Sequence, residues 1–357
     1  TSANSMLYQQ SNSKNHLKCL MTVDGEPLFG QFDQPIQDLS LSTFRYFNSM
    51  DKKASKFSQY FHYKQFQFVT INTGQYIIGA AIADIRYLGS GFLYLYDIAN
   101  NTLLENSWLR PPTIGYHTTP SAHSGFATIG GEHNNIRFTI KQGHWQLEIN
   151  SPKVKARLNL NKSKHNQPLA MCSPAGYNGW TYTEKHNGLA VEGQLSIDQQ
   201  PQALNSALAS YDFSAGYMRR ETSWCWASIN GLINGHVFGL NLAAGVNETG
   251  VTENAYWLNG QRHYLPPVQF SFQRDRSKQS ADPSWSIASD NSVTSYPKVA
   301  LEFTPVNSRE ERLNLGFLKS NFRQYIGYYH GVITDLKGNN IHINNLIGLG
   351  EDHFARW

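Results

Sequence analysis

The densest group of residues able to move protons is Glu351-Asp352-His353, close to the end of the sequence. If this segment forms a strand, Glu351 and His353 share one face and Asp352 points to the other. A carboxylate beside a histidine can tune that histidine as a general acid or base. The alternative is a structural ion-pair network with Arg356 as partner. Asp352 and His353 are therefore candidate catalytic residues, with both interpretations open.

A further candidate acid, Glu253, lies in the aromatic-rich stretch 219–272. A carboxyl group buried there would have a raised pKa and could donate a proton near neutral pH. Within this stretch, Asn234-Gly235 predicts a two-residue hairpin turn, because Asn and Gly tolerate the positive φ angles of a type I′ turn. The predicted register places Ile233 opposite His236.

Side chains alternate across a strand, so this register divides the hairpin into two faces. The mixed face combines indoles, amides and a hydroxyl: Trp224, Trp226, Ser228, Asn230, Gly239, Asn241 and Ala243. The apolar face suits packing on a core: Cys225, Ala227, Ile229, Phe238, Leu240 and Leu242. The mixed face fits the wall of a ligand cavity. It also fits a barrel interior whose polar groups bond one another, and Asn230-Gly231 offers a competing turn that would exchange the faces.

A second hairpin is predicted at Asn259-Gly260, with Tyr256 opposite His263. This pair is either a proton-handling site or ordinary cross-strand packing. Asn254 enters the hairpin beside Glu253 on the opposite face. Asn254, Tyr256 and His263 are therefore candidate ligand contacts, together with Trp224, Trp226, Ser228 and Asn241.

Two other charged groups stand out. Arg219, followed by Arg220, could bind an anionic head group such as a carboxylate, because the guanidinium fork matches that geometry; a surface arginine pair is the alternative. Asp84 lies between apolar neighbours in a predicted strand. A buried carboxylate needs a partner, and Arg86 or Lys64 could supply it.

Strand patterns dominate the chain from about residue 58 onwards, and helical periodicity is weak throughout. Gly130-Gly131 and Gln142-Gly143 recur at roughly the 8–12-residue spacing typical of an antiparallel barrel or sandwich. The polar segment 197–216 is the best candidate boundary. We therefore predict an all-β fold of two tandem antiparallel β-barrels or sandwiches, with an N-terminal domain of residues 1–200 that includes an extended lead-in, and a C-terminal domain of residues 201–357.

Composition narrows the functional classes. The formal charge of +4 is small for 357 residues and no basic stripe is present, so nucleic-acid binding is not favoured. The three cysteines fit a reduced compartment and form no zinc pattern. No apolar run approaches the ~18 residues of a membrane span. Phosphate-binding loops, nucleophile elbows and HExxH motifs are absent. These features predict a cytoplasmic protein without metal or cofactor; the oligomeric state stays open.

Several segments together resemble a known family: CSPAGYNGWTYTEK, DFSAGYMRRETSWCWAS, GLNLAAG, TENAYWLNG, LEFTP and GEDHFARW. They are similar to the domain of unknown function DUF2804, a distant relative of tandem-lipocalin proteins that include a carotenoid hydratase and lipocalin-like cyclases. The resemblance runs from about Asp84 to the C-terminus. It implies two lipocalin-like barrels with a cavity for a long apolar molecule.

The resemblance supplies no mechanism. The hydratase works with a His-x-Trp and a Tyr-x-Asp arrangement, whereas here Phe238 stands two residues after His236 and Leu258 two after Tyr256. No hydratase residue can therefore be carried over.

The sequence thus favours a cofactor-independent enzyme that hydrates, isomerises or cyclises a hydrophobic lipid or isoprenoid. A carboxylate, Glu253 or Asp352, would give acid–base help with His353 in support, and Trp224 and Trp226 would stabilise developing positive charge. The alternative is a carrier that shelters the same kind of ligand unchanged, and a scaffold without a ligand is a third possibility.

Overall fold

The structure, a computed structural model, describes residues 18–245, 252–273 and 283–357. These ranges are nearly all-β, as predicted, because aromatic and β-branched residues alternate with polar ones along most of the chain. The short helix α2 (Lys56–His62) begins after Ser55, whose side-chain oxygen accepts a hydrogen bond from the main-chain N–H of Ser58. Within the described ranges, no helix is both long and apolar enough to cross a membrane.

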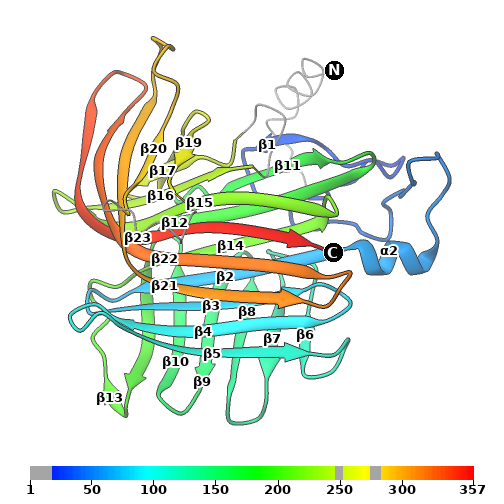
Figure 1. The fold of residues 1–357 in the computed structure, drawn as a ribbon, viewed down its shortest axis with the longest axis horizontal. Helices are drawn as coiled ribbons and strands as arrows, with labels where there is room; N and C mark the ends of the chain where they lie inside the picture. Colours follow the sequence, from blue (N-terminus) through cyan, green and yellow to red (C-terminus); the bar gives the residue numbers. More distant parts are fainter. Residues whose placement is uncertain (1–17, 246–251, 274–282) are drawn as a thin grey trace. The chain divides into compact units, whose positions relative to one another are not determined.

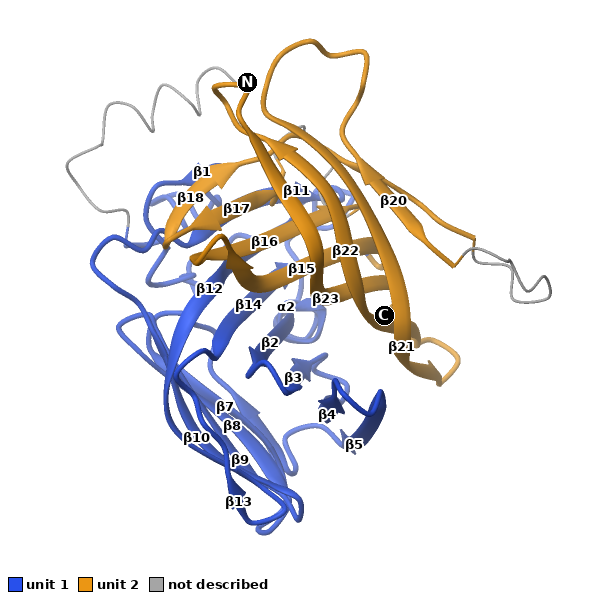
Figure 2. Cartoon of the chain, turned by 90° about the vertical axis from the view of Figure 1, so that its left-hand side faces the viewer, with its two compact units in different colours: residues 1–219 blue, residues 220–357 orange. Residues whose placement is uncertain are grey.

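The chain divides into two compact units, residues 1–219 and 220–357 (Figure 2). The division lies between Arg219 and Arg220, whereas the sequence analysis placed a boundary between residues 200 and 201. Each unit contains a curled antiparallel sheet, close to a barrel in the first and a half-barrel in the second. The predicted tandem all-β architecture is confirmed.

In unit 1, the main path of the sheet runs β5-β4-β3-β2-β14-β12-β10-β9-β8-β7-β6, and β1, β11 and β13 pair beside it (Figure 1). The strands are β1 (Gly30–Phe32), β2 (Lys64–Asn72), β3 (Tyr76–Asp84), β4 (Gly89–Asp97), β5 (Thr102–Arg110), β6 (Tyr116–Thr118), β7 (Gly125–Gly130), β8 (Asn135–Lys141), β9 (His144–Asn150), β10 (Val154–Asn161), β11 (Leu169–Ala175), β12 (Gly179–Ile197), β13 (Gln200–Pro201) and β14 (Leu208–Tyr217).

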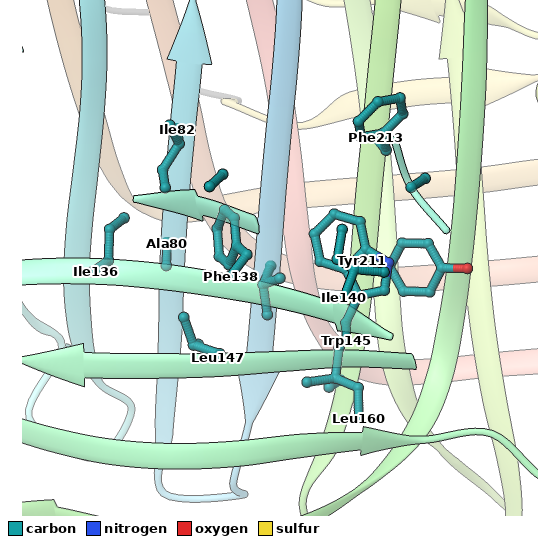
Figure 3. Close-up of a cluster of buried hydrophobic side chains, with 14 of the residues drawn as sticks. Ala80, Ile82, Ile136, Phe138, Ile140, Trp145, Leu147, Leu160, Tyr211 and Phe213 are labelled. Atoms are coloured by element: carbon teal, nitrogen blue, oxygen red, sulfur yellow. The ribbon is translucent and has the colours of Figure 1, made fainter. Parts of the chain in front are cut away.

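One large hydrophobic cluster fills the interior of unit 1. Figure 3 shows side chains from β3, β8, β9, β10 and β14 meeting there. Trp145 stacks on Tyr211 with 4.7 Å between ring centroids and 13° between ring planes. The hydroxyl oxygen of Tyr211, red in Figure 3, points away from the aliphatic side chains. The interior therefore contains a polar region as well as an apolar one.

In unit 2, the sheet order is β18-β17-β16-β15-β23-β22-β21-β20-β19. The strands are β15 (Glu221–Ile233), β16 (His236–Ala244), β17 (Ala255–Leu258), β18 (Gln261–Tyr264), β19 (Gln269–Ser271), β20 (Trp285–Ala288), β21 (Lys298–Asn314), β22 (Lys319–Thr334) and β23 (Asn340–Arg356).

Both predicted hairpins of unit 2 form in the predicted register. Ile233 pairs with His236 and Tyr256 with His263. The turn residues Asn234 and Asn259 have φ angles of 50°, which Asn tolerates in a type I′ turn. The competing turn at Asn230-Gly231 does not form, because both residues pair with β16.

The apolar face of the first hairpin packs into the hydrophobic cluster of unit 2, as predicted. Opposite Ala227 on the next strand is Gly350, where a Cβ atom would lie 2.6 Å from Cε1 of Phe303 and 3.0 Å from Cζ3 of Trp285. The missing side chain lets both aromatic rings pack against the backbone of β23. The mixed face lies on the other side of the same sheet.

Candidate functional site

Strand register extends the mixed face of the hairpin across β15, β23 and β22. Trp224 pairs with His353 and Trp226 with Glu351. On the far side of β23, His353 pairs with Phe322, and Glu351 pairs with Gln324. Because paired residues project to the same face, these side chains form a continuous strip. We call this strip, formed by Trp224, Trp226, Phe322, Gln324, Glu351 and His353, the indole–histidine face.

Glu351 is the electrostatic centre of the indole–histidine face. Its side chain is buried, and each carboxylate oxygen accepts a hydrogen bond from a different strand. Nε1 of Trp224 donates to Oε1 at 3.1 Å, and Nε2 of Gln324 donates to Oε2 at 3.2 Å. These two donors hold the carboxylate in one orientation.

His353 lies beside this carboxylate and is only 8% exposed. Its Nε2 shares a hydrogen bond with the hydroxyl of Ser320 at 3.1 Å, and its Nδ1 lies 3.8 Å from Oε1 of Glu351. Within the described residues, Nδ1 has no hydrogen-bond partner. Ser320 therefore orients the imidazole at one nitrogen, and the other nitrogen is buried without a hydrogen bond among the described residues.

Aromatic rings enclose the imidazole on two sides. The ring centroid of Trp224 lies 4.0 Å from that of His353, and Phe322 meets it edge-on at 5.0 Å. Such a group can exchange a proton through Nδ1 while the neighbouring carboxylate balances the charge of the imidazolium that forms. The indole can stabilise a positive charge over its ring face.

Amide side chains on the mixed face are used to fix the backbone. Trp226 donates from Nε1 to Oδ1 of Asn241 at 2.7 Å, and Nδ2 of Asn241 donates to the main-chain oxygen of Glu253 at 2.8 Å. Asn254 accepts from the main-chain N–H of Ala243 and donates to the main-chain oxygen of Pro266. Asn241 and Asn254 thereby tie the segment before β17 to β16.

Asp352 does not join His353. It projects to the opposite face of β23, as strand alternation predicts, and its Oδ2 lies 3.4 Å from Nη1 of Arg323. Glu253 is buried just before β17. Their catalytic roles stay predictions. The carboxylate that the structure places beside His353 is Glu351.

The remaining predicted contacts lie in different surroundings. Ser228 is buried opposite Asn241 on the mixed face. Arg219 is exposed at the end of unit 1. Tyr256 and His263 stack with 4.7 Å between centroids and 13° between planes, and Tyr256 belongs to the hydrophobic cluster.

Burial shifts the pKa values of this stacked pair away from neutrality. It raises the pKa of Tyr256 to about 12 and lowers that of His263, although the charge of Asp335 acts on His263 in the other direction. Both groups are therefore favoured in their neutral forms. This arrangement fits the cross-strand packing interpretation.

Sequence reasoning missed three groups of unit 1: Glu184, Lys162 and the hydroxyl of Tyr211. Glu184 is buried and accepts hydrogen bonds from the hydroxyls of Tyr182 at 3.0 Å and Tyr211 at 2.7 Å. Burial raises the pKa of Glu184. The alternation Tyr182-Thr183-Glu184 placed the carboxyl on the face of the buried tyrosine, but the partner strands are remote in sequence. Within the described ranges, no three His, Cys, Asp or Glu side chains are grouped as metal ligands would be.

Among curated proteins, none matches the sequence of this chain. Solved structures share its fold. The crystal structure of CghA with Sch210972 is 9% identical, covers 94% of this chain and 97% of that chain, and superposes with a TM-score of 0.54. A second crystal structure of CghA is 10% identical, with 81% and 87% coverage and a TM-score of 0.51.

Kievitone hydratase from Nectria haematococca is 13% identical, with 82% and 88% coverage and a TM-score of 0.48. At 9% and 10% identity, the likeness to the two CghA structures shows the fold alone. The sequence itself gives a closer assignment. The model of the domain of unknown function DUF2804 matches residues 10–357, and the chain therefore belongs to this family.

Proposed function

We propose that this protein is an enzyme that transfers a proton to or from a hydrophobic, unsaturated substrate, with His353 as the acid–base group and Glu351 as its charge partner. The observation that carries the proposal is the buried Nδ1 of His353. It lies 3.8 Å from the carboxylate and has no hydrogen-bond partner in the described part of the chain. Buried polar atoms in folded proteins are usually bonded, and a substrate would complete this one.

The surroundings suit proton transfer to carbon. Trp224 packs on the imidazole and donates to Glu351, so one residue fixes both the base and its charge partner. Ser320 is a positioning residue, because its hydroxyl holds Nε2 and leaves Nδ1 to the substrate. Hydration, isomerisation and cyclisation of an alkene can all begin with such a proton transfer, and none requires a redox cofactor.

The fold gives independent support for a ligand. CghA, whose structure covers 94% of this chain, was crystallised with Sch210972. The second candidate function is a carrier that binds the same class of ligand unchanged. It is favoured by Asn241 and Asn254, because the hydrogen bonds of Asn241 to Trp226 and the backbone, and of Asn254 to the backbone, give both amides a structural role.

Incubation with a total lipid and isoprenoid extract in D₂O separates these functions. The wild-type protein should incorporate deuterium into an extract component, detected by mass spectrometry of the recovered lipids. His353→Gln removes the acid–base group and should lower the rate by about 10²-fold or more. Glu351→Gln keeps the shape of the side chain and should also slow the reaction, because the imidazolium loses its charge partner.

His342→Gln is the matched control, because His342 lies on the same strand, β23, and is exposed. It should keep the wild-type rate. Recovery of bound but unlabelled lipid from the wild-type protein would favour the carrier. Equal rates for wild type and His353→Gln would exclude His353 as the acid–base group.

A further inference from the structure

Unit 1 contains a chain of hydrogen bonds that the proposed proton transfer at His353 does not use. Nζ of Lys162 donates to the hydroxyl of Tyr211 at 2.6 Å, and that hydroxyl donates to Oε2 of Glu184 at 2.7 Å. The hydroxyl of Tyr182 donates to the other carboxylate oxygen at 3.0 Å and accepts from the N–H of Ile36 at 3.0 Å. The chain connects an amine to a buried carboxyl group.

Comparison with Lys185 shows how unusual the partner of Lys162 is. Lys185 is buried and forms an ion pair with Asp212. Within the described ranges, no carboxylate lies within 4.0 Å of Nζ of Lys162, whose partner is a phenol instead. The hydroxyl of Tyr211 uses its only hydrogen in the hydrogen bond to Glu184, so its oxygen can only accept a hydrogen bond from the amine. Partial burial without a carboxylate partner shifts an amine toward its neutral form.

The electrostatic surroundings agree with this geometry. Burial lowers the pKa of Lys162 to about 8, although the charge of Glu184 acts in the opposite direction. The charge of Lys162 adds to the effect of burial in lowering the pKa of His123. The ring of Tyr211 lies under the amine, with 4.6 Å from Nζ to the ring centroid. Part of the Lys162 population is therefore uncharged, and nucleophilic, near neutral pH.

Lys162 is placed where a reactant can reach it. It directly follows β10 and is half-buried, whereas Tyr211 and Glu184 are each only 1% exposed. A Cβ atom at Gly143, in the turn between β8 and β9, would lie 3.6 Å from Nζ. The amine thus lies beside a hairpin turn, and the hydrogen bonds that could carry its proton run through Tyr211 to the buried Glu184. Trp145, which stacks on Tyr211, and Leu160 belong to the hydrophobic cluster of unit 1.

We propose that Lys162 is a reactive amine that condenses with the carbonyl group of an apolar aldehyde, with Tyr211 and Glu184 relaying protons. The nitrogen lone pair attacks the carbonyl carbon, and the carbonyl oxygen takes up a proton to give a carbinolamine. This intermediate then loses its hydroxyl group as water, and a C=N bond to Nζ forms. The two hydrogens of the amine and the carbonyl oxygen leave together as one water molecule, so no oxidant or reductant takes part.

The full-length protein tests this directly with decanal and sodium cyanoborohydride, which reduces the C=N bond to a stable amine. Peptide mass mapping then locates the adducts. At limiting decanal near neutral pH, Lys162 should be modified at least about tenfold faster than Lys141, because an ordinary lysine is almost fully protonated there. Lys141 is the matched control: it is exposed and borders the same turn.

The pH dependence of trapping adds a readout that a structural role would not produce. The rate at Lys162 should rise with a midpoint near pH 8, set by the amine with Tyr211, Glu184 and His123 around it. Lys162→Arg should remove this adduct, and Tyr211→Phe should slow its formation. Equal labelling of Lys162 and Lys141 in the wild-type protein, which needs no variant to fold, would overturn the proposal.

Discussion

Three lysines of unit 1, two of them buried and Lys162 half-buried, have different partners, and the partner influences the charge of each lysine. Lys185 has the carboxylate of Asp212, whereas Lys162 has the hydroxyl of Tyr211. Lys64 is 1% exposed, donates to the main-chain oxygen of Phe61, and lies 5.0 Å from the ring centroid of Tyr87. Only an ionised partner offsets the cost of burying an ammonium group.

Lys64 should therefore make the stability of the protein pH-dependent. Burial, with the charge of Arg86 second, lowers its folded-state pKa from 10.5 to about 7, although Asp84 acts in the opposite direction. Between these two values the unfolded state binds more protons than the folded state, so the free energy of unfolding rises with pH. Relative to Lys64→Met, the wild type should gain roughly 2–4 kcal/mol from pH 6 to pH 10.

Urea unfolding of both proteins at several pH values measures this difference. The Met side chain keeps most of the buried volume and cannot titrate. The contributions of the other titratable groups to the pH dependence therefore cancel when the two proteins are compared. A difference that is flat across this pH range would show that Lys64 stays protonated in the folded state. Near Lys64, Nη1 of Arg86 lies 3.3 Å from Oδ2 of Asp84. Arg86 is one of the two partners that the sequence suggested for Asp84.

At the scale of the element, one face of β23 holds the candidate site and the other packs against the hydrophobic cluster of unit 2. Glu351 and His353 project to the indole–histidine face, whereas Gly348 and Gly350 lie on the face of the hydrophobic cluster. A Cβ atom on Gly350 would lie 2.6 Å from Phe303, a ring that is fully buried. The strand can position the candidate site only if both faces fit their neighbours.

Gly350→Ala should therefore lower the free energy of unfolding by about 1–3 kcal/mol, the usual cost of overpacking. Gly231→Ala on β15 is the matched control, because its nearest contact would be 3.4 Å from Leu346 and its φ angle is ordinary. That variant should change stability by less than about 1 kcal/mol. Urea unfolding followed by tryptophan fluorescence compares the two. Similar stabilities of the two variants would mean that the rings of Phe303 and Trp285 can shift to accept the added methyl group at little cost.

Local patterns predicted those parts of the site that lie within one hairpin or one strand. Asn-Gly turns fixed which residues of β15 and β16 share a face, and alternation placed Glu351 with His353. The contributions of β22 could not be predicted in this way. Gln324 and Ser320 reach Glu351 and His353 through pairing of two long strands, and no local signal in the sequence sets that register.

At the scale of the whole molecule, the same limit applies to the division of the chain. A boundary near residue 200 follows from polar composition, yet β14 (Leu208–Tyr217) lies between β2 and β12 in the sheet of unit 1. Tyr211 on β14 brings its hydroxyl to Glu184 on β12. To close the curled sheet, β14 must pair with β2, which lies far earlier in the chain. Amino-acid composition does not indicate which strand that partner is.

Each unit has its own hydrophobic cluster and one polar group for which we propose chemistry, His353 in unit 2 and Lys162 in unit 1. For His353, ligand binding and turnover should be separable. An enzyme gains rate from contacts that strengthen in the transition state, so removing the acid–base group should abolish turnover while ligand contacts remain. A carrier has no turnover to lose.

Thermal unfolding with the extract fraction that becomes deuterated tests this separation. At a hundredfold excess over the dissociation constant, the ligand should raise the Tm of the wild type by roughly 5–10 °C. His353→Gln should keep that rise and lose deuterium incorporation, whereas Trp224→Ala should reduce both, each shift measured from the variant's own Tm. In the wild type, no rise with any fraction of the extract, together with no deuterium incorporation, would exclude enzyme and carrier together and leave a scaffold. A rise lost in His353→Gln would instead make the imidazole a binding group, because its removal would then weaken the ground-state complex itself.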